Sequence, residues 1–361
     1  MKSKILIAMD SFKGSLTSLE AGQAVRAGLS NWPQENVHLL PLADGGEGTL
    51  EMLDYFFDLK LHEEKIKDLY KKPIKSKIYY SEEIAFLEAA HSAGLREERD
   101  VFKASSQGFG QELLIASQLK TQKIILGLGG TGVNDGGMGL LHSLGLRFFK
   151  GDQLLEPSLD NLLQVNRIEG EIKELPPIII ASDVNNPLLG QRGASAVYGP
   201  QKGLKLDEIE IVDRAMANYA ELLENHFSKR VKDLPGAGAA GGLGFALLLI
   251  GAKLEPGFKL LTSLCNFDRY ISWADIVITG EGSFDYQSLH GKGPTELARK
   301  AKEKNKTVIG LFGSVKEESP LFDSLFSIQA GPVSLEEAIK KATTKKNLER
   351  VARSIAGLEQ A

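Results

Sequence analysis

Seven glycines between positions 127 and 139 constrain this chain more than any other feature. They follow an apolar segment with Ile124 and Ile125, which predicts a buried strand, in the sequence KIILGLGGTGVNDGGMGLLHSLG. Backbone without Cβ atoms can approach a bound group closely, and a helix expected from about Gly137 to Leu144 would offer its N-terminus to an anion. Asn134 and Asp135 add an amide and a carboxylate to the loop. The pattern favours a phosphate-binding loop over a packed strand-to-helix turn.

The same loop contains a match to a dinucleotide-binding fingerprint. Gly127, Gly129 and Gly132 spell G-x-G-x-x-G after the expected strand, and Asp152 follows at a plausible distance. The fingerprint requires the helix to begin at its third glycine, whereas residues 133–137 intervene here. A NAD-dependent oxidoreductase acting on a small hydroxy acid is therefore the alternative hypothesis.

Composition excludes several classes of protein. A length of 361 residues suggests about two domains, and a net charge of -4 with both signs mixed argues against a nucleic-acid partner. The single cysteine, Cys265, excludes an internal disulfide and lies in an apolar setting typical of a core residue in a reducing compartment. The longest apolar run, Phe245 to Ile250, is far shorter than the ~20 residues that cross a bilayer. We expect a cytoplasmic protein without a membrane segment.

Strand and helix patterns alternate at both ends of the chain. Strands are expected at 4–9 and 37–42, followed by the loops DSFKGS and ADGGEGT, and again at 275–279 and 307–312. If the strands are parallel, these loops open on the edge of the sheet where ligands bind. From about residue 63 the runs become short and alternating, which predicts antiparallel strands. We therefore expect α/β architecture: a discontinuous Rossmann-like parallel-sheet domain, 1–62 and 270–361, with an inserted mixed α/β domain, 63–269.

Six loops at strand or helix ends combine glycine with small or polar residues. They are DSFKGS, ADGGEGT, GGTGVNDGG, SDVNNPLLG, PGAGAAGG and TGEGSFDYQSLHGK. Phosphoryl transfer requires backbone N–H groups and cations around the migrating group, together with carboxylates for Mg²⁺ and for the nucleophile's proton. The chain has no G-x-x-x-x-G-K-[ST] motif, so it is not a P-loop enzyme.

Taken together, eight motifs resemble the type I glycerate kinase family nearly from end to end. They are DSFKGSLTS, ADGGEGT, EAAHSAGL, GGTGVNDGG, SDVNNPLLG, YGPQKG, PGAGAAGGLG and TGEGSFDYQSLHGK. The resemblance implies a two-domain enzyme with its site in the cleft between the domains, which phosphorylates D-glycerate with ATP. Two loops depart mildly: GTGVNDGG stands where the family usually has GSATNDGG, and SSQGFG where it has TTSYGTG.

Candidate site residues follow from these loops. Asp183 ends the expected strand 178–180 and precedes Asn185 and Pro187, which suits it to hold Mg²⁺ or to accept the proton of a hydroxyl. Asp183, Asp135 and Lys292 are the catalytic candidates, and Asp183, Glu281 and Asp285 are the Mg²⁺ candidates. The nucleotide-binding loop is expected to comprise Gly129, Gly130, Thr131, Gly132, Gly136 and Gly137. Substrate or phosphate contacts are expected from Asp10, Lys13, Ser15, Asp44, Glu47, Asn134, Asn185, Arg192, Glu281, Asp285, Ser288 and His290.

These observations favour an ATP- and Mg²⁺-dependent kinase for D-glycerate. The oxidoreductase and a non-catalytic sensor of a phosphorylated small acid are the rival hypotheses. The sequence leaves open whether the 2- or the 3-hydroxyl is the acceptor, and it predicts no particular oligomeric state.

Overall fold

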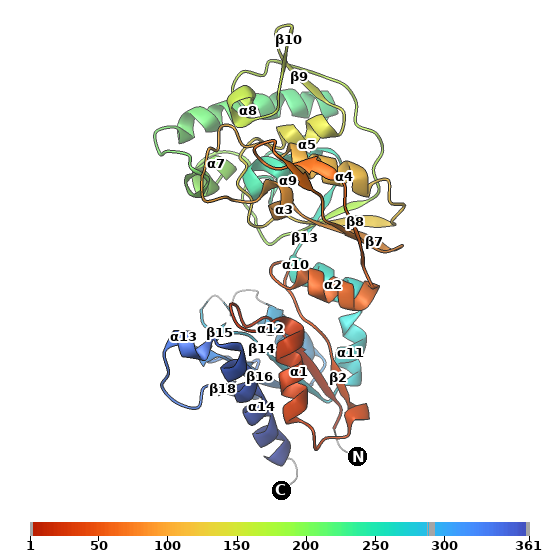
Figure 1. The fold of residues 1–361 in the computed structure, drawn as a ribbon, viewed down its shortest axis with the longest axis vertical. Helices are drawn as coiled ribbons and strands as arrows, with labels where there is room; N and C mark the ends of the chain where they lie inside the picture. Colours follow the sequence, from red (N-terminus) through yellow and green to blue (C-terminus); the bar gives the residue numbers. More distant parts are fainter. Residues whose placement is uncertain (1–2, 287, 289–292, 359–361) are drawn as a thin grey trace. The chain divides into compact units, whose positions relative to one another are not determined.

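The computed structural model describes residues 3–286, 288 and 293–358, shown in Figure 1. The chain divides into two compact units, unit 1 (Met1–Asp58 and Gly257–Ala361) and unit 2 (Leu59–Pro256). The sequence pattern suggested transitions at 62/63 and 269/270. The later transition lies at 256/257 in the structure, because α10 (Gly257–Leu264) packs in unit 1. A Cβ at Gly257 would lie 2.0 Å from the carbonyl oxygen of Asp44, which also belongs to that unit.

Unit 1 is built on a five-stranded sheet in the order β18-β16-β14-β1-β2, with every neighbouring pair parallel. Buried β-branched and aliphatic runs form its three central strands, as expected for a sheet covered on both faces. Strand β18 was not predicted, and β2 stops at Leu39 rather than at residue 42. The strands are β1 (Ile5–Met9), β2 (Val37–Leu39), β14 (Ile276–Gly280), β16 (Thr307–Phe312) and β18 (Ser324–Ser327).

Helices cover this sheet, and α1 lies beside α14 although they are far apart in the sequence (Figure 1). Their close approach requires glycine, because a Cβ at Gly28 would lie 2.5 Å from the carbonyl oxygen of Glu349. A capping box formed by Thr17 and Glu20 is present at the start of α1. The other unit 1 elements are η1 (Gln34–Asn36), α2 (Thr49–Phe57), α11 (Phe267–Trp273), α12 (Gly293–Glu303), α13 (Leu335–Ala338) and the strand pair β15 (Ser283–Phe284) and β17 (Ser314–Val315), with α1 spanning Ser18–Gly28 and α14 Lys341–Leu358.

Unit 2 has a six-stranded mixed sheet in the order β13-β12-β8-β7-β6-β3. The four strands β13, β12, β8 and β7 are parallel to one another. Strand β6 pairs antiparallel with β7, and β3 pairs antiparallel with β6, which confirms the change of pattern expected near residue 63. The strands are β3 (Lys60–His62), β6 (Ile78–Tyr80), β7 (Ile84–Glu88), β8 (Lys123–Gly127), β12 (Ile178–Ala181) and β13 (Lys253–Glu255). Two smaller antiparallel sheets are β4 (Lys65–Lys67) with β5 (Pro73–Lys75), and β10 (Gln153–Leu155) with β9 (Arg147–Lys150) and β11 (Arg167–Glu169).

Unit 2 contains one long amphipathic helix, α8 (Ile209–Phe227), whose apolar stripe is buried at Val212, Met216, Tyr219 and Leu223. None of the helices in the described part of the chain is both long enough and apolar enough to cross a membrane. The remaining helices are α3 (Ala89–Ala93), α4 (Gln107–Ala116), α5 (Met138–Ser143), α6 (Leu159–Leu162), α7 (Ala194–Tyr198), η2 (Pro200–Lys202), η3 (Ala239–Gly242) and α9 (Leu243–Leu249).

Candidate active site

A cavity of about 740 Å³ opens at the carboxyl edge of the unit 1 sheet. The chain runs from β1 to β2 in one direction, and from β14 to β16 and β18 in the other. The topological switch point therefore lies between β1 and β14, which is where open α/β sheets bind ligands. The loops after all five strands contribute to the cavity, at Asp10 to Ser15, Asp44 and Glu47, Glu281 to Ser283, Gly313 and Ser314, and the segment from Ile328 to Thr344.

Four carboxylates predicted from the sequence line this cavity. Asp10 and Glu281 are buried, Asp44 is half-buried and Glu47 is exposed. Asp10 follows β1 directly and accepts a hydrogen bond from the backbone N–H of Ser11 at 2.6 Å. These acids come from three strand ends, so the parallel sheet brings together residues more than 200 positions apart. The edge is suited to a ligand that carries a cation.

A lysine and a serine, Lys13 and Ser15, are two further predicted site residues that line the cavity. Lys13 is exposed in the loop after β1. Ser15 is buried, and its Oγ lies 2.7 Å from Thr344 Oγ1, which ties this loop to α14. The Ser15 hydroxyl therefore fixes the loop after β1 against α14.

The loop after β14 is held together by its own side chains. Ser288 Oγ donates to Glu281 Oε1 at 2.9 Å, and the Ser288 backbone N–H donates to Asp285 Oδ1 at 3.4 Å. Asp285 does not line the cavity described above, and its carboxylate also accepts from Ser283 Oγ at 3.4 Å. The predicted residues His290 and Lys292 lie outside the described residues.

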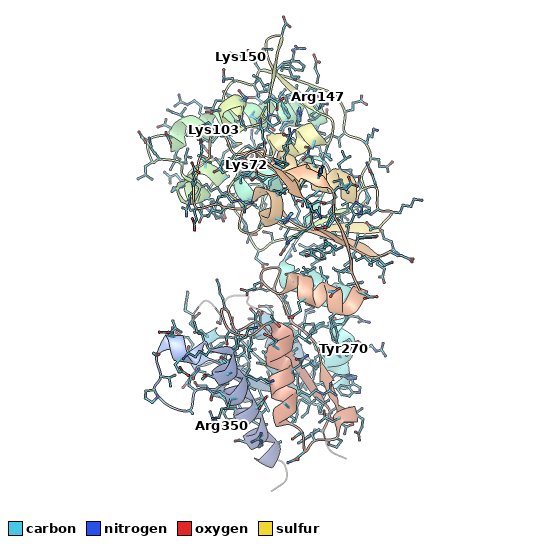
Figure 2. The ribbon with its side chains drawn as sticks, in the orientation of Figure 1. Lys72, Lys103, Arg147, Lys150, Tyr270 and Arg350 are labelled. Carbon is cyan, nitrogen blue, oxygen red and sulfur yellow. The ribbon has the colours of Figure 1, made fainter. Side chains whose placement is uncertain are left out.

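Sequence reasoning missed the far wall of the cavity, which the segment from Ile328 to Ile339 forms. This segment follows β18, which was itself not predicted. Arg350, labelled in Figure 2, donates from Nη2 to the carbonyl oxygen of Ile328 at 2.9 Å and holds the start of the segment. The available signal in the sequence was the apolar pair Val333 and Leu335 just before two glutamates, Glu336 and Glu337.

In unit 2 the glycine-rich loop turns inward. Asp135 is fully buried and accepts four hydrogen bonds, from Ser106 N at 2.8 Å, Ser106 Oγ at 2.9 Å, and Gly137 N and Gly139 N both at 3.2 Å. Burial raises the pKa of the Asp135 carboxyl, and these hydrogen bonds act in the opposite direction. The N–H groups expected to meet a phosphate thus bind a carboxylate of the same loop.

Close packing explains the glycines of this loop. The backbone N–H of Gly136 donates to the carbonyl oxygen of Gly241 at 3.0 Å, and a Cβ at Gly241 would lie 2.1 Å from the carbonyl oxygen of Val133. The two glycine-rich stretches of unit 2 therefore press against each other. Residues 131–137 are buried, and only Gly129 and Gly130 are exposed.

Three further polar groups are buried beside Asp135. Asn134 Nδ2 donates to Ser195 Oγ at 3.0 Å, and Lys202 Nζ donates to the carbonyl oxygen of Val133 at 2.7 Å. Burial lowers the pKa of Lys202 to about 8, and the charge of Asp135 acts in the opposite direction. Burial also raises the pKa of Tyr219. This cluster fixes the loop from inside the core.

The carboxyl edge of the unit 2 sheet carries the exposed candidates. Glu88 ends β7 and pairs in register with Gly127 at the end of β8, which in turn pairs with Ala181 at the end of β12. Asp183 and Asn185 follow β12 and are exposed, as is Arg192. Asn186 is used structurally, since it accepts from Tyr198 Oη at 2.8 Å and donates to the carbonyl oxygen of Arg192 at 2.8 Å.

The structure does not fit the dinucleotide alternative. Helix α5 begins at Met138, not at Gly132 where the fingerprint requires it. The loop's N–H groups at Gly132 and Gly136 donate to the carbonyl oxygens of Ala93 and Gly241. A pyrophosphate would have to displace both bonds.

A second cavity, of about 410 Å³, is lined by residues that already have partners. Lys103 pairs with Asp100 at 2.9 Å and Lys71 with Glu156 at 3.4 Å, and Figure 2 labels Lys72 and Lys103 in this part of unit 2. Within the described ranges, no three His, Cys, Asp or Glu side chains form a group that could hold a metal ion by themselves. Of these two cavities, the one in unit 1 is the better-built ligand site.

Fold and site together define an α/β protein with a ligand cavity at the switch point of a parallel sheet. The family model described as "Glycerate kinase family" matches residues 5–360. The chain is 35% identical to the glycerate kinase of Halalkalibacterium halodurans over 98% of this chain and 97% of that protein. It is 36% identical to the glycerate 2-kinase of Escherichia coli over 98% of this chain and 97% of the relative.

Structure comparison agrees with these sequence relationships. A crystal structure of a proposed glycerate kinase 2 from Salmonella typhimurium LT2 superposes with a TM-score of 0.89 at 35% identity, and covers 100% of this chain and 99% of that one. This chain belongs to the glycerate kinase family, a family of kinases that phosphorylate an alcohol group. The resemblance inferred from eight short motifs is thereby confirmed.

Proposed function

We propose that this protein transfers the γ-phosphoryl group of ATP to D-glycerate, with Mg²⁺, in the cytoplasm. The observation that carries the proposal is the acid-lined cavity at the sheet's switch point in a chain of the glycerate kinase family. The name of the Escherichia coli relative, glycerate 2-kinase, supports the 2-hydroxyl as the acceptor and 2-phosphoglycerate as the product.

The residues of the cavity fit Mg²⁺. This ion prefers oxygen ligands and is usually held by one or two carboxylates, with phosphate oxygens and waters as the other ligands. Asp10, Asp44 and Glu281 supply such carboxylates in one cavity. When bound, Mg²⁺ neutralises charge on the phosphoryl oxygens. Of the predicted metal ligands, Glu281 keeps this role, whereas Asp285 serves the loop itself.

The proposed roles of the other residues follow from exposure. Asp183 is exposed after a buried strand and is our candidate to accept the proton of the glycerate hydroxyl. Lys13 lines the cavity of unit 1 and is our candidate to neutralise phosphate charge there. Lys292 and His290 remain candidates for the same task on sequence grounds. Asp135 is reassigned to holding the loop, because its carboxylate is buried and already accepts four hydrogen bonds.

A coupled assay for ADP release tests the proposed function. We expect Mg²⁺-dependent ADP formation on addition of D-glycerate, with turnover in the range of ~1 to 100 per second common among kinases. Phosphorus and proton NMR of the product would identify the phosphorylated hydroxyl. Reduction of NAD by glycerate without ADP release would overturn the proposal in favour of the oxidoreductase. Binding of phosphoglycerate without turnover would favour the sensor.

A further inference from the structure

One wall of the unit 1 cavity, lined by Val333, Leu335 and Ile339, is apolar and exposed. Val333, Leu335 and Ile339 line the cavity with 49%, 76% and 39% of their surfaces accessible. The buried apolar side chains of Phe12 and Ile328 also line the cavity. A large aliphatic side chain that is three-quarters exposed at the rim of a cavity is suited to cover a flat apolar ligand.

The charged side chains that line the same cavity are mostly negative. Asp10, Asp44, Glu47 and Glu281 are negative, and Lys13 is the single lysine or arginine among the described lining residues. A small bare anion such as glycerate would be repelled by this excess of carboxylates and would leave the apolar wall uncovered. A ligand with an apolar ring at one end and a metal-bound polyphosphate at the other would match both groups of side chains.

Unit 2 offers no comparable phosphate cradle in its glycine-rich loop. The N–H groups of Gly132, Gly136, Gly137 and Gly139 are all donated within unit 2. The buried part of the loop therefore does not offer the convergent free donors on which anion binding by glycine-rich backbone depends, and only Gly129 and Gly130 are exposed.

We propose that the unit 1 cavity is the nucleotide site, with the base on the wall formed by Val333, Leu335 and Ile339. The metal-bound polyphosphate would then extend toward Asp10 and Glu281. The inference rests on the proposed use of ATP and adds where the nucleotide binds. The cavity volume of about 740 Å³ lies within the range usual for small-molecule sites. Gln329 also lines the wall, and Asn347 Nδ2 orients its amide by donating to Oε1 at 3.3 Å.

The test combines an exposed double substitution with a matched control. Val333→Ser with Leu335→Ser removes the apolar wall, and Leu206→Ser changes a leucine that is 81% exposed in unit 2. We expect the Kd for Mg-ADP, measured by calorimetry, to rise on the order of tenfold in the double variant. The control and the KM for D-glycerate should change less than about twofold. Equal melting temperatures would establish that the variants are folded.

Photolabelling with 8-azido-ATP gives a readout that is independent of turnover. Labelled peptides should come from the segment 328–341, and labelling there should fall in the double variant. An unchanged Kd, or labelling confined to residues 129–137, would overturn the inference while glycerate-dependent ADP release still upheld the proposed function. A raised KM for D-glycerate with unchanged nucleotide binding would overturn it too, and would assign the wall to the acid. If the double substitution weakens nucleotide binding but the wild-type protein shows no glycerate-dependent turnover, the nucleotide site is upheld and the proposed function is refuted.

Discussion

Lys202 donates from its ammonium group to the carbonyl oxygen of Val133 at 2.7 Å in the interior of unit 2. The lysine is 2% exposed, so burial opposes its charge and lowers its pKa from 10.5 to about 8. Between pH 8 and 10.5 the unfolded chain keeps a proton that the native lysine has lost. Native stability therefore rises with pH in this window. Below pH 8 the native state bears the full free-energy cost of burying the charged lysine.

Replacement of this lysine by methionine should remove that pH dependence. Lys202→Met cannot titrate and gives up one hydrogen bond at every pH. The wild type should gain stability relative to the variant between pH 8 and 9.5, by about 2 kcal/mol at ~1.4 kcal/mol per pH unit. Urea unfolding of both proteins at pH 7, 8 and 9.5 measures the difference. A constant difference across that range would show that Lys202 is not titrating there.

Asp135→Asn should destabilise the protein. In the variant only the amide oxygen can accept hydrogen bonds. The amide NH₂ group would therefore face some of the donors from Ser106, Gly137 and Gly139 without being able to accept from them. We expect a loss of about 2 to 4 kcal/mol in unfolding free energy, since each bond is made to a buried charge. Calorimetric melting would detect it. A fully stable variant with a large loss of kcat would return Asp135 to the catalytic candidates.

The contrast between Asp135 and Asp10 shows what the sequence could reveal. Strands β1, β14 and β16 are buried apolar runs, so their carboxyl ends, and with them Asp10 and Glu281, could be placed on one edge beforehand. The burial of Asp135 could not be predicted in the same way, because its hydrogen-bond partner Ser106 is 29 residues away and lies at the start of another helix. Strand β18 escaped prediction because it has only four residues and none is fully buried. The apolar wall after it was therefore missed too.

Asp183→Asn tests the proposed proton acceptor. The substitution keeps the shape of an exposed side chain and removes its charge, so kcat should fall ~10²-fold or more while the melting temperature stays nearly constant. Asp207→Asn, another exposed aspartate of unit 2, is the matched control. A lower melting temperature with normal turnover of the folded enzyme would instead identify Asp183 as a loop residue.

Cys265 should be unreactive in the native protein. Its thiol is buried in unit 1, and burial raises its pKa to about 12, so almost no thiolate forms at pH 8. Alkylation by iodoacetamide, followed by mass spectrometry, should be slow in buffer and at least ~100-fold faster in denaturing urea, where a thiol has a pKa near ~8.5. Rapid alkylation of the native protein would contradict the burial of this side chain.

The central position of β1 has a consequence for biosynthesis. Its two neighbours in the sheet are β2 and β14, and β14 begins only at Ile276. At ~5–20 residues per second, roughly 15 to 50 seconds of translation separate β1 from its second partner. Unit 2 leaves the ribosome complete in that interval, while the nascent strand Ile5–Met9 presents an unpaired apolar edge. Until β14 has been synthesised, that edge is therefore open to pairing with other segments of the nascent chain.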